Sequence, residues 1–102
     1  MSADAEKDLR SALGETVGTA AWPLLEAHAK RGGLIFVDPS LELVDVAVAV
    51  AEDQTQAVTD WLGRGLLTKP SDEDIARRSE GDEEPFRFVI VQPFVLAQSM
   101  AG

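Results

Sequence analysis

The stretch LIFVDPSLELVDVAVAVAED, residues 34–53, carries the most regular pattern of the sequence. Valine alternates with aspartate or alanine over residues 44–51, and this period of two is typical of a β-strand with one apolar face. Alanine favours a helix, but the four β-branched valines outweigh it. Residues 34–38 also form a short apolar run, and Asp38 followed by Pro39 suits a type I turn. We therefore predict an antiparallel β-hairpin of two strands, residues 34–38 and 44–51.

Helical patterns lie on both sides of the predicted hairpin. Apolar residues recur at helical spacing over residues 4–16. A second helix is expected from Trp22, with Pro23 in its first turn and the sequence KRGG as its end. After the hairpin, Asp53 is predicted to be the N-cap of a third helix, with Gln56 three residues later as in a weak capping box. This helix should end at the sequence GRG.

The last third of the chain adds three shorter elements. The sequence LLTK, residues 66–69, predicts a short strand. Ser71 and Asp74 have capping-box spacing and predict a further helix. A final strand begins at Phe86, and Pro93 forces a bulge or an edge position in it.

The order of elements predicts an α+β fold: two N-terminal helices, a β-hairpin, then a helix, a short strand, a helix and a final strand. The sheet should be mixed or mainly antiparallel, with three or four strands packed by helices. We expect the strands at residues 34–38 and 88–91 near the sheet centre, because they are apolar on both faces. One domain should cover residues 1–102, with loose ends at about residues 1–5 and 99–102.

Composition excludes several classes of function. Eighteen acids against nine bases give a formal net charge of −9, which disfavours nucleic acids and anionic membranes as partners. The chain has no cysteine, so disulfides, thiolate catalysis and thiolate metal sites are excluded. No apolar run approaches the length of a membrane span, and the first ten residues lack the apolar core of a secretion signal. We expect a cytoplasmic protein that binds no membrane.

Carboxylates gather around the predicted hairpin, so a small-molecule or divalent-cation site, with or without catalysis, is one alternative. Mg²⁺ and Ca²⁺ require several converging oxygens, but the spacing matches no calcium loop. Asp38 is explained by the turn, whereas Asp45 has no structural explanation beyond facing solvent. The candidate binding residues are Glu15, Asp38 and Asp45. No residue is assigned a catalytic, cofactor-binding or metal-binding role, and no cofactor is expected.

The histidine and the two tryptophans are explained first by structure. His28 is the only histidine, which excludes the two-histidine zinc motif, and it lies in the last turns of a predicted helix. Trp22 and Trp61 lie on the apolar sides of predicted helices, where core packing is the default. Either tryptophan could instead anchor a partner, because tryptophan is enriched at binding hot spots. Both stay candidate binding residues.

Basic residues concentrate locally at Arg64, Lys69, Arg77 and Arg78. The arrangement of helix, GLLTKPSDED and helix is similar to part of a winged-helix unit, which would bind nucleic acid through these side chains. However, acids at residues 72–74 occupy the helix end that a recognition helix presents to bases. We therefore expect these charges to complement helix termini, and nucleic-acid binding is disfavoured.

Several stretches together resemble a small bacterial family, the domain of unknown function number 2288. They are ET at residues 15–16, the Trp-containing helix, GGLIFVDPSLELVDVAVAVAED, VTDWL, GLL, PSDED and the closing VQPFVLAQ. The likeness covers roughly residues 9–98, although Phe94 stands where members often have tryptophan. The resemblance implies a compact bacterial domain and supplies no activity, ligand or catalytic residue.

A well-specified core without a catalytic constellation favours a non-enzymatic interaction module. Its partner would be another protein or a second copy of the chain, bound through a sheet edge or an apolar helix face. The carboxylate site is the first alternative, and nucleic-acid binding through the four basic residues is the second.

Overall fold

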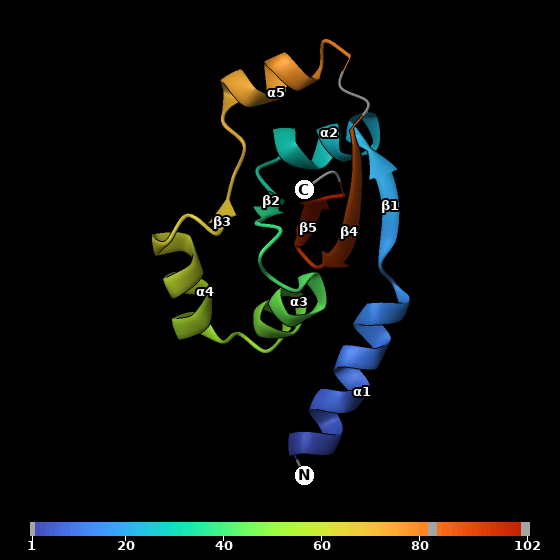
Figure 1. The fold of residues 1–102 in the computed structure, drawn as a ribbon, viewed down its shortest axis with the longest axis vertical. Coiled ribbons are helices and arrows are strands. Elements are labelled where there is room, and N and C mark those ends of the chain that lie inside the picture. The colour runs from blue at the N-terminus through green and yellow to red at the C-terminus, as the bar shows by residue number, and fades with distance from the viewer. Residues whose placement is uncertain (1, 82–83, 101–102) are drawn as a thin grey trace.

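The structure, a computed structural model, describes residues 2–81 and 84–100. In chain order, the elements are α1 (Ser2–Glu15), β1 (Gly18–Ala21), α2 (Trp22–Lys30), β2 (Leu34–Val37), α3 (Leu43–Ala51), α4 (Thr55–Gly63), β3 (Leu67–Thr68), α5 (Asp72–Arg78), β4 (Pro85–Val91) and β5 (Phe94–Ser99). Figure 1 shows α1 projecting from the rest of the chain, with the N-terminus at its far end. Of the ends expected to be loose, residues 1 and 101–102 lie outside the described residues.

The five strands form one sheet in the order β1-β4-β5-β2-β3. Strand β2 runs parallel to β5, with Leu34 opposite Val95, and the other neighbouring strands are antiparallel. The predicted α+β class, with a mixed sheet packed by helices, is confirmed. The sheet has five strands in place of the three or four expected. Strands β2 and β4 both lie between two neighbours, as their apolar sequences predicted.

Apolar clusters lie on the two faces of this sheet. One cluster, the α2-side core, has these buried members: Ala20, Trp22, Leu25, Ala29, Leu34, Ile75, Phe86, Val95 and Ala97. The other, the α3-side core, has these: Ile35, Val37, Leu43, Val46, Ala47, Leu67, Val89, Val91 and Leu96. Successive residues of β2 alternate between the two clusters, as a strand requires. Helices therefore cover both faces, which explains why the LIFV stretch is apolar throughout.

The predicted hairpin strand at residues 44–51 is wrong, because Leu43–Ala51 is helix α3. Leu43, Val46 and Ala47 have helical spacing, and they are 1%, 0% and 0% exposed. Val48 and Ala49 are buried as well, so the helix is enclosed on most sides. A helix that is apolar nearly all round belongs in a core. Burying a valine gains about 1.5–3 kcal/mol, which exceeds the few tenths of a kcal/mol by which valine disfavours a helix.

Two further sequence predictions need correction at the sheet. Strand β1 was not predicted, because the sequence GTAA lacks the β-branched pattern of a strand; it forms by pairing with β4. A Cβ atom at Gly18 would lie 3.1 Å from the Phe88 ring, so glycine lets this ring lie against β1. Pro93 does not form a bulge: Gln92 and Pro93, joined by a cis peptide bond, make the turn between β4 and β5, where Val91 faces Phe94.

Helices α2, α3 and α4 end with the same hydrogen-bond pattern, the Schellman motif. At the end of α3, the Gln54 N–H donates to Ala49 O at 2.8 Å and the Asp53 N–H to Val50 O at 3.2 Å. The residue in the left-handed conformation is Gly32 in α2, Asp53 in α3 and Gly65 in α4, with φ of 78°, 56° and 75°. The prediction that Asp53 is the N-cap of the following helix is therefore wrong. The N-cap of α4 is Gln54, whose side chain makes no capping bond.

One buried polar side chain fixes the segment between β2 and α3. Gln98 in β5 is 6% exposed. Its Nε2 group donates to Asp38 O at 3.0 Å and to Leu41 O at 2.7 Å. The Asp38 carboxylate accepts the Ser40 N–H at 2.9 Å, which confirms the turn predicted at Asp38 and Pro39. The entry into α3 is thus tied to the central strand.

Candidate functional site: an apolar groove beside helix α4

Helix α4 lies beside the sheet without being enclosed by it. All nine residues of α4 are described, and none is buried. In Figure 1 the helix lies at the side of the molecule, away from β4 and β5. Val58 and Trp61 pack against the α3-side core but remain partly exposed. Most stability of a helix in a protein comes from a packed apolar face, so an amphipathic helix with no buried residue is unusual.

A groove of about 340 Å³ separates this helix from the body of the chain. The face of α4 that lines it has helical spacing and consists of Thr55, Val58, Thr59 and Leu62. Ala49 and Val50 of α3 line it from another side, and the sheet contributes Ile35, Leu67 and Phe94. The lining is mainly apolar, and its two threonines, Thr55 and Thr59, are exposed.

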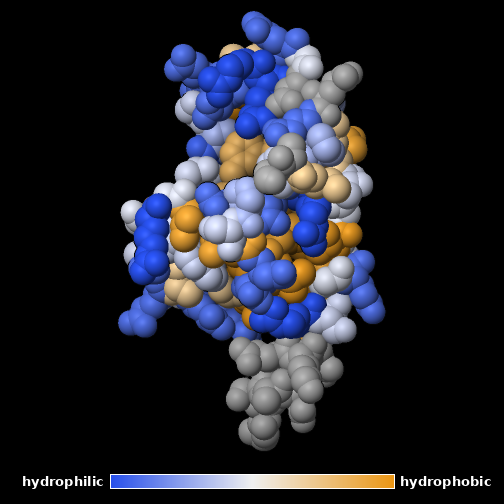
Figure 2. Space-filling view, viewed as in Figure 1, coloured by the Kyte–Doolittle hydropathy of each residue, from blue (hydrophilic) through white to orange (hydrophobic). Residues whose placement is uncertain are grey.

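Apolar surface continues beyond the groove. Leu62 is 50% exposed, one of few large apolar residues on the surface of the described chain. Figure 2 shows apolar residues exposed in the middle of the view, at the level where Figure 1 places α3 and α4, with hydrophilic residues around them. The arrangement offers a concave, mainly apolar surface to another molecule.

Two charged side chains also line the groove. Asp53 enters from the connection between α3 and α4, and Lys69 follows β3. Neither side chain forms an ion pair with another described residue. Glu52, next to Asp53, accepts a hydrogen bond from Gln54 Nε2 at 3.1 Å. Left-handed backbone geometry at Asp53 places these two acids at the start of α4.

A second groove, of about 290 Å³, lies on the α2-side face of the sheet and includes Asp38 and Arg78. The Arg78 guanidinium carbon lies 5.9 Å from the Trp22 ring, 5.1 Å from the Phe36 ring and 5.4 Å from the Phe86 ring. Such distances are typical of cation–π contacts. Its Nη1 atom lies 3.4 Å from Glu84 Oε2. Arg78 therefore serves as the cover of an aromatic cluster.

Of the carboxylates predicted as binding residues, Asp38 alone lines either of these grooves. The pKa of Asp38 is lowered, mainly because its carboxylate accepts the Ser40 backbone N–H. Asp45 lies in the first turn of α3, where a negative charge suits the helix macrodipole, and pairs with Arg10 of α1. Glu15 is the exposed last residue of α1. The structure does not bring the three carboxylates together.

The two predicted tryptophans have different surroundings. Trp22 is 1% exposed and belongs to the α2-side core, and its Nε1 atom donates to Ser79 Oγ at 3.4 Å. Trp61 is partly exposed on α4, beside the groove residues Val58 and Leu62. His28 lies near the end of α2 and is partly buried.

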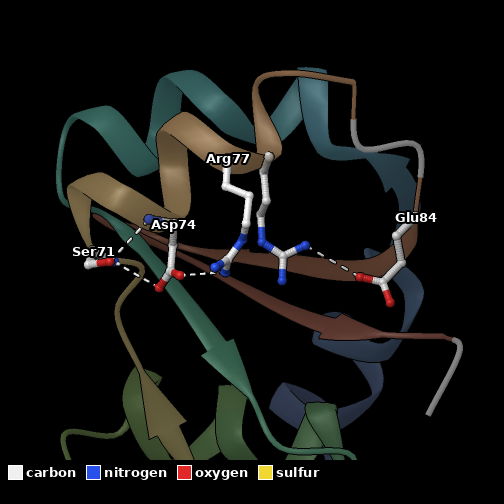
Figure 3. Close-up of polar contacts among 5 residues, drawn as sticks. Ser71, Asp74, Arg77 and Glu84 are labelled. Atoms are coloured by element: carbon white, nitrogen blue, oxygen red, sulfur yellow. Dashed lines mark hydrogen bonds and ion pairs between the residues drawn. The ribbon is translucent and has the colours of Figure 1, made fainter.

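The basic residues mostly pair within their own helices or loops. Arg64 Nε lies 3.1 Å from Asp60 Oδ2, and Arg77 Nη2 lies 2.6 Å from Asp74 Oδ1. Figure 3 shows Arg77, Asp74 and Ser71 together along α5, with Glu84 apart from them. The predicted capping box is confirmed: the Asp74 N–H donates to Ser71 Oγ at 3.1 Å, and the Ser71 N–H donates to the Asp74 carboxylate at 3.3 Å. The bond from the Ser71 N–H to the Asp74 carboxylate is the main cause that lowers the pKa of Asp74.

The described residues contain neither a metal-binding cluster nor a membrane-spanning helix. Among residues 2–81 and 84–100, no group of three histidine, aspartate or glutamate side chains is arranged to hold a metal ion. Within the same ranges, every helix is too short or too polar to cross a membrane.

The sequence contained a partial signal for the groove. Ala57, Val58, Trp61 and Leu62 have the spacing of one apolar side of a helix. On the side of α4 that lines the groove, two positions are polar, Thr55 and Thr59. A fully enclosed helix would carry apolar residues at these positions. The open groove itself depends on the distance between α4 and the sheet, which no local pattern encodes.

Comparisons place the chain among proteins of known sequence and structure. The sequence pattern of the family described as "Protein of unknown function (DUF2288)" matches residues 8–99, which confirms the resemblance found in the sequence. No curated protein matches the chain. The solution NMR structure of PA1075 from Pseudomonas aeruginosa is similar with a TM-score of 0.77 and 33% sequence identity. The similarity covers 93% of this chain and 87% of that chain.

Proposed function

The chain belongs to the DUF2288 family, whose description gives no activity, and we propose that it is a non-enzymatic interaction module. Its binding surface is the groove between α4 and the sheet, together with the exposed Leu62 at its opening. The bound molecule is an apolar segment of a polypeptide. A cytoplasmic location is part of this proposal.

The observation that carries the proposal is the apolar face of α4, which is only partly covered. A helix of nine residues is too short to be stable alone in water, so it depends on packing that the described chain supplies only in part. Contiguous exposed apolar surface of this kind is typical of protein interaction sites. A groove beside a helix is also one of the recurrent ways in which proteins bind an amphipathic segment.

The residues have distinct roles in this proposal. Val58 and Leu67 form apolar surface inside the groove, where a partner side chain would be removed from water. Leu62 extends that surface outward, which suits a partner larger than the groove itself. The hydroxyls of Thr55 and Thr59 supply hydrogen-bonding groups at the edge, as polar rims of interfaces do.

A displayed library of random peptides of about twelve residues, the mean length of a protein helix, tests the proposal. Peptides selected on the unmodified chain should lose binding about tenfold or more to Leu62→Asn, because this residue is the exposed anchor. Leu24→Asn is the matched control. Leu24 is a leucine on α2 that is 72% exposed and lies outside the groove.

Circular dichroism and thermal unfolding should show that both variants keep the fold, because both leucines are exposed. Val58→Ala, which keeps α4 helical, should also weaken the selected peptides. Equal binding by the unmodified chain, Leu62→Asn and Leu24→Asn would contradict the proposal. Failure to select any peptide would contradict it too.

A further inference from the structure

We infer that the segment bound in the α4 groove is a basic amphipathic helix of a different protein and not a second copy of this chain. This inference rests on the proposed function and specifies the partner. It is carried by the charges on and around the groove.

The acids at the start of α4 provide the local charge. Asp53 lines the groove and Glu52 is its neighbour, and both are exposed. Neither forms an ion pair with another described residue. The acids farther along α4 and α3 are already matched: Asp60 pairs with Arg64, and Asp45 pairs with Arg10. The carboxylates left for a partner are therefore at this end of the groove.

Lys69 makes the charge of the groove different on two sides, so that a bound helix has a preferred direction. It lines the groove from the segment after β3, and Asp53 lines it from the segment before α4. A bound helix should place a lysine or arginine near Asp53. At the Lys69 side, an acidic or neutral residue is favoured. Charge arrangements of this kind determine the direction in which a partner binds.

The overall charge argues against self-association. Each chain has a formal net charge of −9, from 18 acids and 9 bases. Two copies repel one another, whereas a basic partner is attracted over the distance of the Debye length. An apolar groove on a strongly acidic chain thus selects an apolar helix with a basic face.

Synthetic helices test this inference. One peptide, the lysine peptide, carries leucines at positions i, i+3, i+4 and i+7 with lysines elsewhere. A matched peptide, the glutamate peptide, carries glutamates in place of the lysines. At low salt, the lysine peptide should bind at least about tenfold more tightly than the glutamate peptide. This difference should shrink between about 0.01 M and 0.15 M salt, as the Debye length falls from about 30 to about 8 Å. A lysine peptide with a scrambled leucine pattern should bind much more weakly, since it has no continuous apolar face.

Charge variants of the chain locate the contact. Glu52→Gln combined with Asp53→Asn should weaken the lysine peptide several-fold, and asparagine tolerates the left-handed conformation at position 53. Lys69→Gln should strengthen its binding, because it removes a positive charge from the lining of the groove. Sedimentation of the chain alone should give the mass of one copy at micromolar concentration.

The outcomes separate this inference from the function on which it rests. Equal binding of lysine and glutamate peptides, with both lost in Leu62→Asn, would keep the interaction module and overturn the basic partner. If the chain forms a dimer and Leu62→Asn makes it dissociate, a second copy occupies the groove, and the inference is overturned. If neither of the peptides nor any library member binds, both proposals fail.

Discussion

Replacing Gln98 with leucine should destabilise the protein by about 2 kcal/mol. The Gln98 side chain is 6% exposed and donates two hydrogen bonds, at 2.7 Å to Leu41 O and at 3.0 Å to Asp38 O. Each such bond contributes about 1 kcal/mol net. Leucine has a similar size but no donor, so both bonds are lost.

The two carbonyls differ in what the substitution does to them. Asp38 O also accepts the Leu41 N–H at 3.0 Å and keeps that bond. The Leu41 carbonyl loses the shorter of the two bonds from Gln98. An unsatisfied polar group costs about 1–3 kcal/mol when it is buried. Leu41 is partly buried, so the lower part of this range applies, and the apolar surface of leucine offsets part of the cost. The loss in free energy of unfolding should therefore be about 2 kcal/mol. It should be smaller than the loss expected if both hydrogen bonds had the largest contribution and nothing offset them.

Urea unfolding monitored by tryptophan fluorescence measures this change. The midpoint should fall while the slope m stays constant, because the surface exposed on unfolding is nearly the same. Gln56→Leu is the control: Gln56 is exposed in the first turn of α4, and its substitution should change the stability by less than about 0.5 kcal/mol. A loss below about 0.5 kcal/mol for Gln98→Leu would refute the role given to this side chain.

Three further predictions concern aspartates. Asp53→Gly should stabilise the protein by about 0.5–1 kcal/mol in urea unfolding, because glycine adopts the left-handed conformation at φ 56° without strain; a destabilised variant would contradict the Schellman assignment. The lowered pKa of Asp38 means that the bond from Ser40 stabilises the folded state above the unfolded value of about 3.8 and is lost as pH falls through the folded value. Asp38→Asn should therefore reduce the fall in unfolding free energy between pH 7 and pH 3, and an unchanged fall would count against that bond. Asp45→Asn should alter stability by less than about 1 kcal/mol, because its pair with Arg10 is half exposed; a larger loss would assign Asp45 a role beyond this surface pair.

The sequence predicted elements with local signals well. Pro23 marks the start of α2, and the Ser71–Asp74 capping box marks that of α5. Glycine at KRGG and GRG marks the ends of α2 and α4. Each of these signals acts through hydrogen bonds or backbone angles within a few residues, so it can be recognised without knowledge of the fold.

Residues 43–51 show why one pattern fits two structures. Alternating valines suit a strand with one buried face, but the same residues place Leu43, Val46, Ala47 and Val50 on one side of a helix. Which arrangement forms depends on what encloses the segment. Here α1, α4 and the sheet contact it, and this environment buries Val46 and Val48 together with Ala47 and Ala49.

Asp53 illustrates a second ambiguity. Aspartate is frequent at helix N-caps and also tolerates the left-handed conformation. Because α3 was predicted to be a strand, no helix was expected to end there, and the N-cap interpretation followed. One wrong element thus changed the role assigned to the residue beside it.

The candidate site was less predictable than the fold. The sequence places Leu62 and Trp61 at apolar positions of a helix, but their exposure depends on the position of α4 relative to the sheet. The carboxylates that attracted attention in the sequence are separate in space, with Asp38 in a turn and Asp45 on α3. A groove lined by two helices and three strands has no local sequence signature.

The position of β5 has a consequence for folding. This strand is the last element in sequence, yet it lies between β2 and β4 and contributes Leu96 to one core and Val95 to the other. Until it is in place, β2 and β4 have no strand between them and both cores lack a side. Contacts between segments so distant in sequence slow folding. The apolar faces of the sheet therefore stay open until residues 94–99 have paired with both neighbours, so the fold should form as one cooperative step.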